Sequence, residues 1–212
     1  CVIYAIVVKP SPLDNSYVIH EKNVGQFKLE RARATVSDKF IEITEDEKGA
    51  LQEVKFKNTE RFNFAYDIVD ELANKCPNKT ALMWVGEKGQ DHAFTFADMK
   101  KYSNMTANYF ESIGIGKGDK VLVILKKHYQ YWFTMLALHK IGAIAIPAVN
   151  QLLEHDLSYR YKAAGVKAVV VTSSGDVARQ AELACKEFPD MIKILVGEKR
   201  EGWHDFNGEM ML

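Results

Sequence analysis

The second half of the chain alternates between short apolar runs and longer amphipathic segments. The apolar runs are predicted strands: VLVIL (121–125), AIAIPA (143–148), AVVVT (168–172) and IKILVG (192–197). Between them, residues 128–142, 154–165 and 176–188 place apolar side chains at helical spacing. Continuously apolar strands that alternate with helices predict an α/β fold, in which helices cover both faces of a mostly parallel sheet. We therefore expect AIAIPA to be covered on both faces.

A helix, a pair of strands and a second helix are predicted upstream of this alternation. Residues 62–76 (FNFAYDIVDELANKC) have one apolar helical face, and the proline that follows ends the helix. Residues 81–96 indicate two strands around a glycine-containing turn. Thr95 and Asp98 form a capping box, which predicts a helix that starts there and closes at Gly114.

Residues 1–48 differ in pattern from the rest and are predicted to form a β-rich N-terminal arm. The segments VIYAIVV (2–8) and VSDKFIEIT (36–44) have strand character, and Pro10 and Pro12 interrupt the stretch between them. The arm contains no motif that predicts a function. Residues 49–212 then form the α/β part.

The charge balance and the cysteines limit the classes of partner. The chain has 28 Lys and Arg against 28 Asp and Glu, so its net charge gives no reason to bind nucleic acid or an acidic membrane. No apolar run approaches the roughly 20 residues that cross a bilayer, and VIYAIVV lacks the basic lead and cleavage site of a signal peptide. The three cysteines are far apart and form no CxxC pair, which indicates reduced thiols and a cytoplasmic protein.

Three predicted strand-to-helix loops are the candidate places for ligand binding. They contain Lys126–Lys127, Asn150–Gln151 and Ser173–Gly175, each directly after an apolar run. In an open parallel sheet, ligands bind at the carboxyl ends of the strands. The alternative is that these polar residues serve only as turn and cap residues, which any such loop needs.

Other motifs are better explained by structure than by chemistry. GIGKGD (114–119) follows a helix and opens a strand, which is the wrong order for a phosphate loop. TSSGD (172–176) has the right order but lacks a basic residue, so Asp176 is predicted to cap the next helix. KKHYQYWF (126–133) joins lysines to aromatic residues, yet its aromatics recur at the spacing of a helical core. The histidines and cysteines have no metal-ligand spacing, and no nucleophile elbow is present.

Read together, several segments resemble the opening of an AMP-forming acyl-CoA synthetase of the acetyl or medium-chain type, a member of the adenylate-forming superfamily. They are FNFAYDIVDELA, ALMW, FTFADMKKYSNMTANYFESIGIGKGDKV, LKKHYQYWFTMLALHKIGAIAIPA, DLSYRYKAAGVKAVV and EGWHDF. The resemblance runs from about Phe56 to about Phe206. It implies part of the large N-terminal domain of an enzyme that uses ATP and Mg to make an acyl-adenylate and then transfers the acyl group to CoA.

The resemblance also implies what this stretch does not supply. The family's phosphate loop, adenine-binding segment and catalytic lysine follow the region that matches, so we expect a truncated synthetase with no catalytic residues, inactive alone and binding no cofactor. Gln151 aligns with a position that approaches CoA in medium-chain members, and Arg160 is a weaker candidate for a phosphate or carboxylate contact. For Arg160 the alternative is a surface salt bridge on its helix.

Two other interpretations remain open. The first is a non-catalytic α/β module that docks a partner chain, by self-association or by binding the remainder of a synthetase. Uncovered helix faces and strand edges would favour an oligomer. The second is an unrelated flavodoxin-like domain, which should carry a phosphate loop after its first strand, and LKKHY (125–129) is not one.

Overall fold

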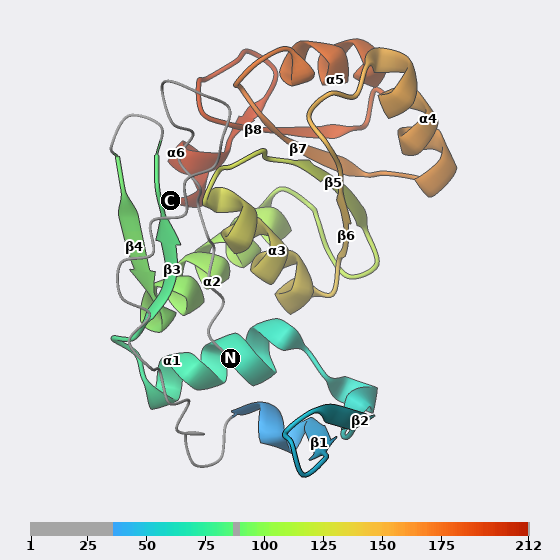
Figure 1. Cartoon of the computed structure of the whole chain (residues 1–212). Coiled ribbons are helices and arrows are strands. Elements are labelled where there is room, and N and C mark those ends of the chain that lie inside the picture. The colour runs from blue at the N-terminus through green and yellow to red at the C-terminus, as the bar shows by residue number, and fades with distance from the viewer. Residues whose placement is uncertain (1–35, 87–89, 212) are drawn as a thin grey trace, which may run out of the picture.

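The computed structural model describes residues 36–86 and 90–211 and shows a parallel sheet with helices on both faces (Figure 1). VIYAIVV (2–8), and with it most of the predicted N-terminal arm, lies outside the described residues. The central sheet has five strands, which are β5 (Lys120–Ile124), β6 (Ile144–Pro147), β7 (Ala168–Thr172), β8 (Ile192–Val196) and β9 (His204–Asp205). They lie in the order β6-β5-β7-β8-β9, and every neighbouring pair is parallel. The α/β prediction is confirmed.

Alternate residues of the strands face two separate hydrophobic cores. Val121 and Val123 of β5 pack with the helices α2 (Phe96–Ser112), α3 (Gln130–Ile141) and α6 (Phe206–Met210). Leu122 and Ile124 pack instead with the helices α4 (Glu154–Ala164) and α5 (Val177–Cys185). Both cores are continuous across β5, β7 and β8, so these central strands are apolar throughout because both of their faces are covered.

The expectation that AIAIPA is covered on both faces is confirmed only in part: Ala145 packs against the α2–α3–α6 core and Ile146 against the α4–α5 core, but both are only partly buried. Among the described strands, β6 lies at the edge of the sheet and pairs only with β5. Ile144 is 48% exposed, and Pro147 is exposed as well. Proline suits an edge position because it has no N–H to donate to a second neighbour. An apolar run alone does not distinguish an edge strand from a central one.

A third layer lies outside α2 and α3. Its strands are β3 (Thr80–Trp84) and β4 (His92–Thr95), which form an antiparallel pair. The predicted helix over 62–76 consists of a π-helix, η3 (Ala65–Asp70), followed by α1 (Glu71–Lys75). A third core, formed mainly by Ala65, Val69, Leu82, Met99, Phe133 and Leu136, joins this layer to α2 and α3.

The start and end of α2 confirm the predicted capping. Thr95 accepts a hydrogen bond from the backbone N–H of Asp98 at 3.1 Å, and the Asp98 carboxylate accepts from the Thr95 N–H at 2.9 Å. The Asp98 carboxylate also accepts from the Thr95 hydroxyl at 2.7 Å, and the two hydrogen bonds that it accepts hold the pKa of Asp98 below its ordinary value. After the helix, Gly114 takes a φ of 92°, which a residue with a side chain rarely adopts.

A buried ion pair joins η3 to the α2–α3 layer. The Lys140 ammonium lies 2.8 and 3.0 Å from the two carboxylate oxygens of Asp70 and 2.7 Å from the Asn104 side-chain oxygen. Only 1% of the Lys140 side chain and 12% of the Asp70 side chain are exposed. Burial lowers the pKa of Lys140, although the hydrogen bond to Asp70 opposes this shift.

The first described residues form a small hairpin beside the third layer (Figure 1). A short 3-10 helix, η1 (Val36–Lys39), leads into β1 (Ile41–Glu45), which pairs antiparallel with β2 (Leu51–Phe56). The strand character predicted for VSDKFIEIT is therefore confirmed for its second half. A one-turn 3-10 helix, η2 (Thr59–Arg61), then connects the hairpin to η3. All six residues of β2 are exposed, so the hairpin adds little to the core.

Candidate functional site

The strand order creates one preferred place for a ligand. From the central strand β5, the chain adds β6 on one side and then crosses to add β7 on the other. The loops that follow β5 and β7 therefore leave the sheet in opposite directions at its carboxyl edge. This divergence is the topological switch point at which open parallel sheets bind ligands, and the crevice lies outside the strand ends.

The loop after β5 is a tight turn that presents two lysines. The His128 N–H donates to the Leu125 carbonyl at 2.9 Å, which closes the turn. Lys126 has a φ of 47°. This left-handed conformation is energetically unfavourable for any residue that has a Cβ atom. Both Lys126 and Lys127 are exposed, and the Trp84 indole N–H donates to the Lys127 carbonyl. The strained turn thus holds two cations at the switch point.

The loop after β7 contributes hydroxyl groups. Thr172 is fully buried at the end of the strand, and its side-chain oxygen accepts from the Ser174 N–H at 3.0 Å. The Ser173 N–H donates to the Val196 carbonyl at 2.9 Å, and the Ser173 hydroxyl oxygen accepts from the Glu198 N–H at 3.0 Å. Ser173 therefore fixes the neighbouring loop, while Ser174 lines the crevice.

A histidine from the β5 loop joins the two loops. His128 Nε2 lies 2.6 Å from the Thr172 side-chain oxygen. Burial, together with the charge of Lys126, lowers the pKa of His128 below its ordinary value. The imidazole is therefore neutral at pH 7, and the contact is a hydrogen bond between uncharged groups.

These groups surround an open cleft of about 480 Å³. Its lining consists of Trp84, Val85, Gln90, Lys126, Lys127, His128 and Ser174. The described residues of this lining include two ammonium groups and no carboxylate, so they are suited to an anionic ligand. An indole and an amide at the rim add a flat apolar surface and a polar partner. The histidine in this lining is hydrogen-bonded to a buried threonine, so it links the loop after β5 to the end of β7.

A second, adjacent cleft of about 420 Å³ lies between the ends of β5 and β6. Lys126 lines both clefts, and Asn150 lines the second. The structure therefore brings the three predicted loops together as two clefts that share one lysine. Gln151 is exposed and lines neither of them.

Two predictions concerned side-chain contacts, a surface salt bridge for Arg160 and a helix cap for Asp176, and the structure shows a different contact for each. The Arg160 guanidinium donates to the Asp156 backbone carbonyl at 3.0 Å, so its contact is with its own helix backbone and not a salt bridge. Asp176 does stand at the start of α5, but its side chain caps no N–H there. Instead its carboxylate binds Arg179 at 2.6 and 2.8 Å, and this contact lowers the pKa of Asp176 to about 2.

Four residues of the switch point were not predicted from the sequence. His128 and Thr172 each stand at the end of a strand, a position that indicates proximity once the two strands are known to be neighbours. Trp84 and Gln90 come from the β3–β4 hairpin, which reaches the sheet edge across a separate layer. No local pattern indicates that approach.

The donor set does not suit a divalent cation. Magnesium prefers carboxylate and phosphate oxygens, and none of the described residues that line the two clefts carries a carboxylate. Within residues 36–86 and 90–211, no group of three His, Cys, Asp or Glu side chains is placed to hold a metal ion. The same ranges contain no helix long and apolar enough to span a membrane.

Comparison with known proteins places this fold in context. Residues 69–206 match the family described as AMP-binding enzyme. Among curated proteins, the acyl-coenzyme A synthetase ACSM5, mitochondrial, of Rattus norvegicus is 31% identical over 155 residues, which is 69% of this chain and 26% of the relative. The human acyl-coenzyme A synthetase ACSM2A, mitochondrial, is 32% identical over 154 residues, 69% of this chain and 26% of the relative. This chain thus spans about a quarter of the length of the relatives it matches.

A solved structure shows the same fold. The benzoate CoA ligase from Burkholderia xenovorans LB400 superposes with a TM-score of 0.59 at 17% identity, covering 71% of this chain and 28% of that one. At this identity the similarity concerns the arrangement of helices and strands.

Proposed function

The chain belongs to the family of AMP-binding enzymes, and on that premise we propose that its residues form part of an acyl-CoA synthetase. In the proposed reaction a carboxylate oxygen attacks the α-phosphorus of ATP, and pyrophosphate leaves. The thiol of CoA then attacks the acyl carbonyl of the adenylate, and AMP leaves. ATP, Mg and CoA are the cofactors that this proposal implies. The observation that carries it is the identity of 31–32% with acyl-coenzyme A synthetases over about 155 residues.

Within such an enzyme, we assign the switch-point cleft to the binding of an anionic part of the reactants. Lys126 and Lys127 supply positive charge, and Ser174 lines the same cleft. A phosphate group is complementary to this lining. Because the described residues of this lining include no carboxylate, the magnesium ion of the proposed reaction would depend on ligands other than these residues.

The proposal includes the expectation that these 212 residues alone form no thioester. The assay is AMP release by the purified chain with ATP, Mg, CoA and acetate, butyrate or a medium-chain acid. Release above a no-protein control would contradict the expectation. A second test places this chain in an acyl-CoA synthetase of the relatives' length, in exchange for the matching segment of that enzyme. If the chimera retains CoA-ligase activity, the assignment is supported. Loss of activity with the fold intact would contradict it.

Gln151 remains the proposed contact with CoA. It lies past the end of β6 on an exposed turn, and its side chain makes no hydrogen bond to the described residues. Its amide is therefore available to a ligand.

In an enzyme of the relatives' length, we expect Gln151→Ala to raise the KM for CoA several-fold, because a neutral hydrogen bond contributes about 0.5–1.5 kcal/mol. Adenylate formation should be unchanged. An unaltered KM would show that Gln151 is only a loop residue. Arg160 is a weaker proposal, because its guanidinium already binds its own helix.

A binding or oligomerisation module is the second candidate, and the exposed edge at β6 favours it. Ile144, Val149 and Leu153 are 48%, 62% and 49% exposed along or just beyond this strand. Such an edge can pair with another copy of the chain or with another part of a synthetase. Sedimentation of the purified chain tests self-association, and a concentration-independent monomer would contradict it.

The predicted cytoplasmic location stays a prediction, and the mitochondrial names of the relatives favour mitochondria instead. Cell fractionation would distinguish the two locations.

A further inference from the structure

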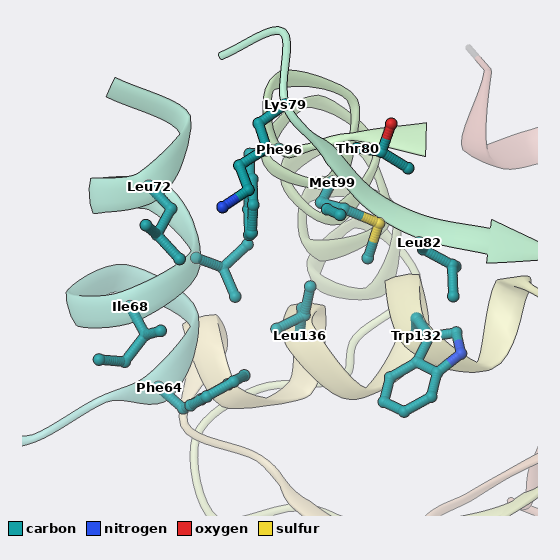
Figure 2. Close-up of a pocket in the computed structure, with 12 residues that line it drawn as sticks. Phe64, Ile68, Leu72, Lys79, Thr80, Leu82, Phe96, Met99, Trp132 and Leu136 are labelled. Carbon is teal, nitrogen blue, oxygen red and sulfur yellow. The ribbon is translucent and has the colours of Figure 1, made fainter. Parts of the chain in front are cut away.

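A third cavity lies between η3–α1, β3 and the outer faces of α2 and α3 (Figure 2). Its volume is about 180 Å³, and it shares no lining residue with the two clefts at the carboxyl ends of the strands. Leu82 of β3, Met99 of α2 and Leu136 of α3 form its floor, and these residues belong to the outer core. The cavity therefore lies on the side of the α2–α3 layer that faces away from the sheet.

The size and lining of this cavity suit a small hydrocarbon group. An engineered protein cavity of about 150 Å³ lined by aliphatic and aromatic residues stays dry and binds benzene. This one is slightly larger and is lined by twelve residues, ten of them apolar. It has room for one six-carbon ring or an alkyl chain of similar length. It is too small for the side chains of a docked helix, which argues against a protein partner as its occupant.

A single positive charge stands at the mouth. Lys79 is the one charged residue among the described residues that line the cavity. Figure 2 draws its ammonium group beside Leu72 and Phe96, and Lys79 is exposed. Within the part of the chain that the structure describes, this side chain forms no hydrogen bond or ion pair. An apolar cavity with one unpaired cation at its mouth is complementary to a molecule with an apolar body and one carboxylate.

The wall opposite β3 is unusual and firmly held. It includes Ile68 and Val69 of the π-helix η3, and π-helical turns are rare and frequently occur at functional sites. The last residue of this helix, Asp70, is fixed by the buried ammonium of Lys140. The wall is thus held in place by a contact that a ligand does not need to make.

We propose that this cavity is a binding site for a small apolar carboxylic acid. The hydrocarbon part lies among Ile68, Leu82 and Leu136, and the carboxylate lies beside the Lys79 ammonium. The site goes beyond the function proposed above, because none of its lining residues lines the two clefts at the carboxyl edge of the sheet. It needs neither ATP nor CoA for occupancy.

The test is methyl-detected NMR titration of the 212-residue chain with hexanoate and, in parallel, with hexan-1-ol. We expect both to cause saturable shifts at the methyl groups of Ile68 and Leu136. Lys79→Met should weaken hexanoate about fivefold, the effect typical of losing one exposed ion pair, and leave hexan-1-ol within twofold. Lys75→Met is the matched control: it removes the same charge from nearby α1, outside the lining, and should change neither affinity.

A filling variant completes the test. Leu72→Trp should abolish the shifts from both ligands, and Ile68→Phe serves the same purpose if thermal unfolding shows that the first variant is not folded. The proposal is overturned if hexanoate gives no saturable shift up to its solubility limit, or if Lys79→Met weakens both ligands equally or neither. It is also overturned if raising the protein concentration alone shifts these methyl groups, because a second copy of the chain would then occupy the cavity.

Discussion

The buried pair of Lys140 and Asp70 allows a quantitative prediction about stability. Removing one partner of a buried ion pair leaves an uncompensated charge, which typically costs about 3–5 kcal/mol of unfolding free energy. Asp70 keeps 12% of its side-chain surface in contact with solvent, so we place Lys140→Met at the lower end, about 3 kcal/mol. For a chain of this size, each kcal/mol lowers Tm by about 2–4 °C, so the expected loss is about 6–12 °C.

The pair as a whole is expected to be nearly dispensable. Burial already lowers the pKa of Lys140, which shows that desolvation opposes the charged form. Replacing both partners by apolar residues of similar volume, Lys140→Met with Asp70→Leu, should therefore cost about 1 kcal/mol or less, far below the sum of the two single changes.

The assay is chemical denaturation of the two single variants and the double variant, monitored by circular dichroism. Lys75→Met is the control, because Lys75 forms an exposed pair with Glu71 at 3.3 Å and should lose less than about 1 kcal/mol. A loss below about 1 kcal/mol for Lys140→Met would show that water solvates the site. If the double variant loses as much unfolding free energy as the two single variants lose together, the two residues do not act as a pair.

Three further predictions concern single residues. Lys126→Gly should be about 1 kcal/mol more stable than Lys126→Ala in denaturation, because only glycine adopts the φ of 47° without strain; equal stabilities would contradict this. Burial lowers the pKa of His128, so the unfolded chain binds a proton more readily than the folded one. The free energy of unfolding should therefore be highest above about pH 6.5 and should fall as the pH drops below that value. This fall should be shallower in His128→Gln, and an unchanged pH dependence in the variant would contradict the prediction. Burial raises the pKa of Cys185 to about 11, so mass spectrometry should find it alkylated by iodoacetamide much more slowly in the native than in the unfolded chain; rapid native labelling would refute this.

The local elements could be predicted because their signals are local. The capping box at Thr95, the left-handed glycine after α2 and the alternation of β5 to β8 depend on residues close in sequence. The edge position of β6 could not be predicted in the same way. Strand order is a matter of which strands pair, and Ile144 in an edge strand has the same neighbours in sequence as it would in a central one.

The candidate site was predictable only in part, for the same reason. The lysines after β5 and the serines after β7 were identified because strand ends can be located from the pattern. The contact of His128 with Thr172 joins residues 44 positions apart, and it follows only from the pairing of β5 with β7. The approach of Trp84 depends on how a separate layer packs, which no spacing in the sequence encodes.

The order of the five strands also bears on how the sheet can be assembled during synthesis. β5 is made first and lies between β6 and β7, and each later strand pairs with one that the ribosome has already produced. No strand has to be inserted between two that have already paired, and no early strand waits for a distant partner at the end of the sheet. Domains fold from the N-terminus as the chain emerges. The sheet can therefore grow outward from β5, first toward β6 and then toward β9, in the sequence in which its strands leave the exit tunnel.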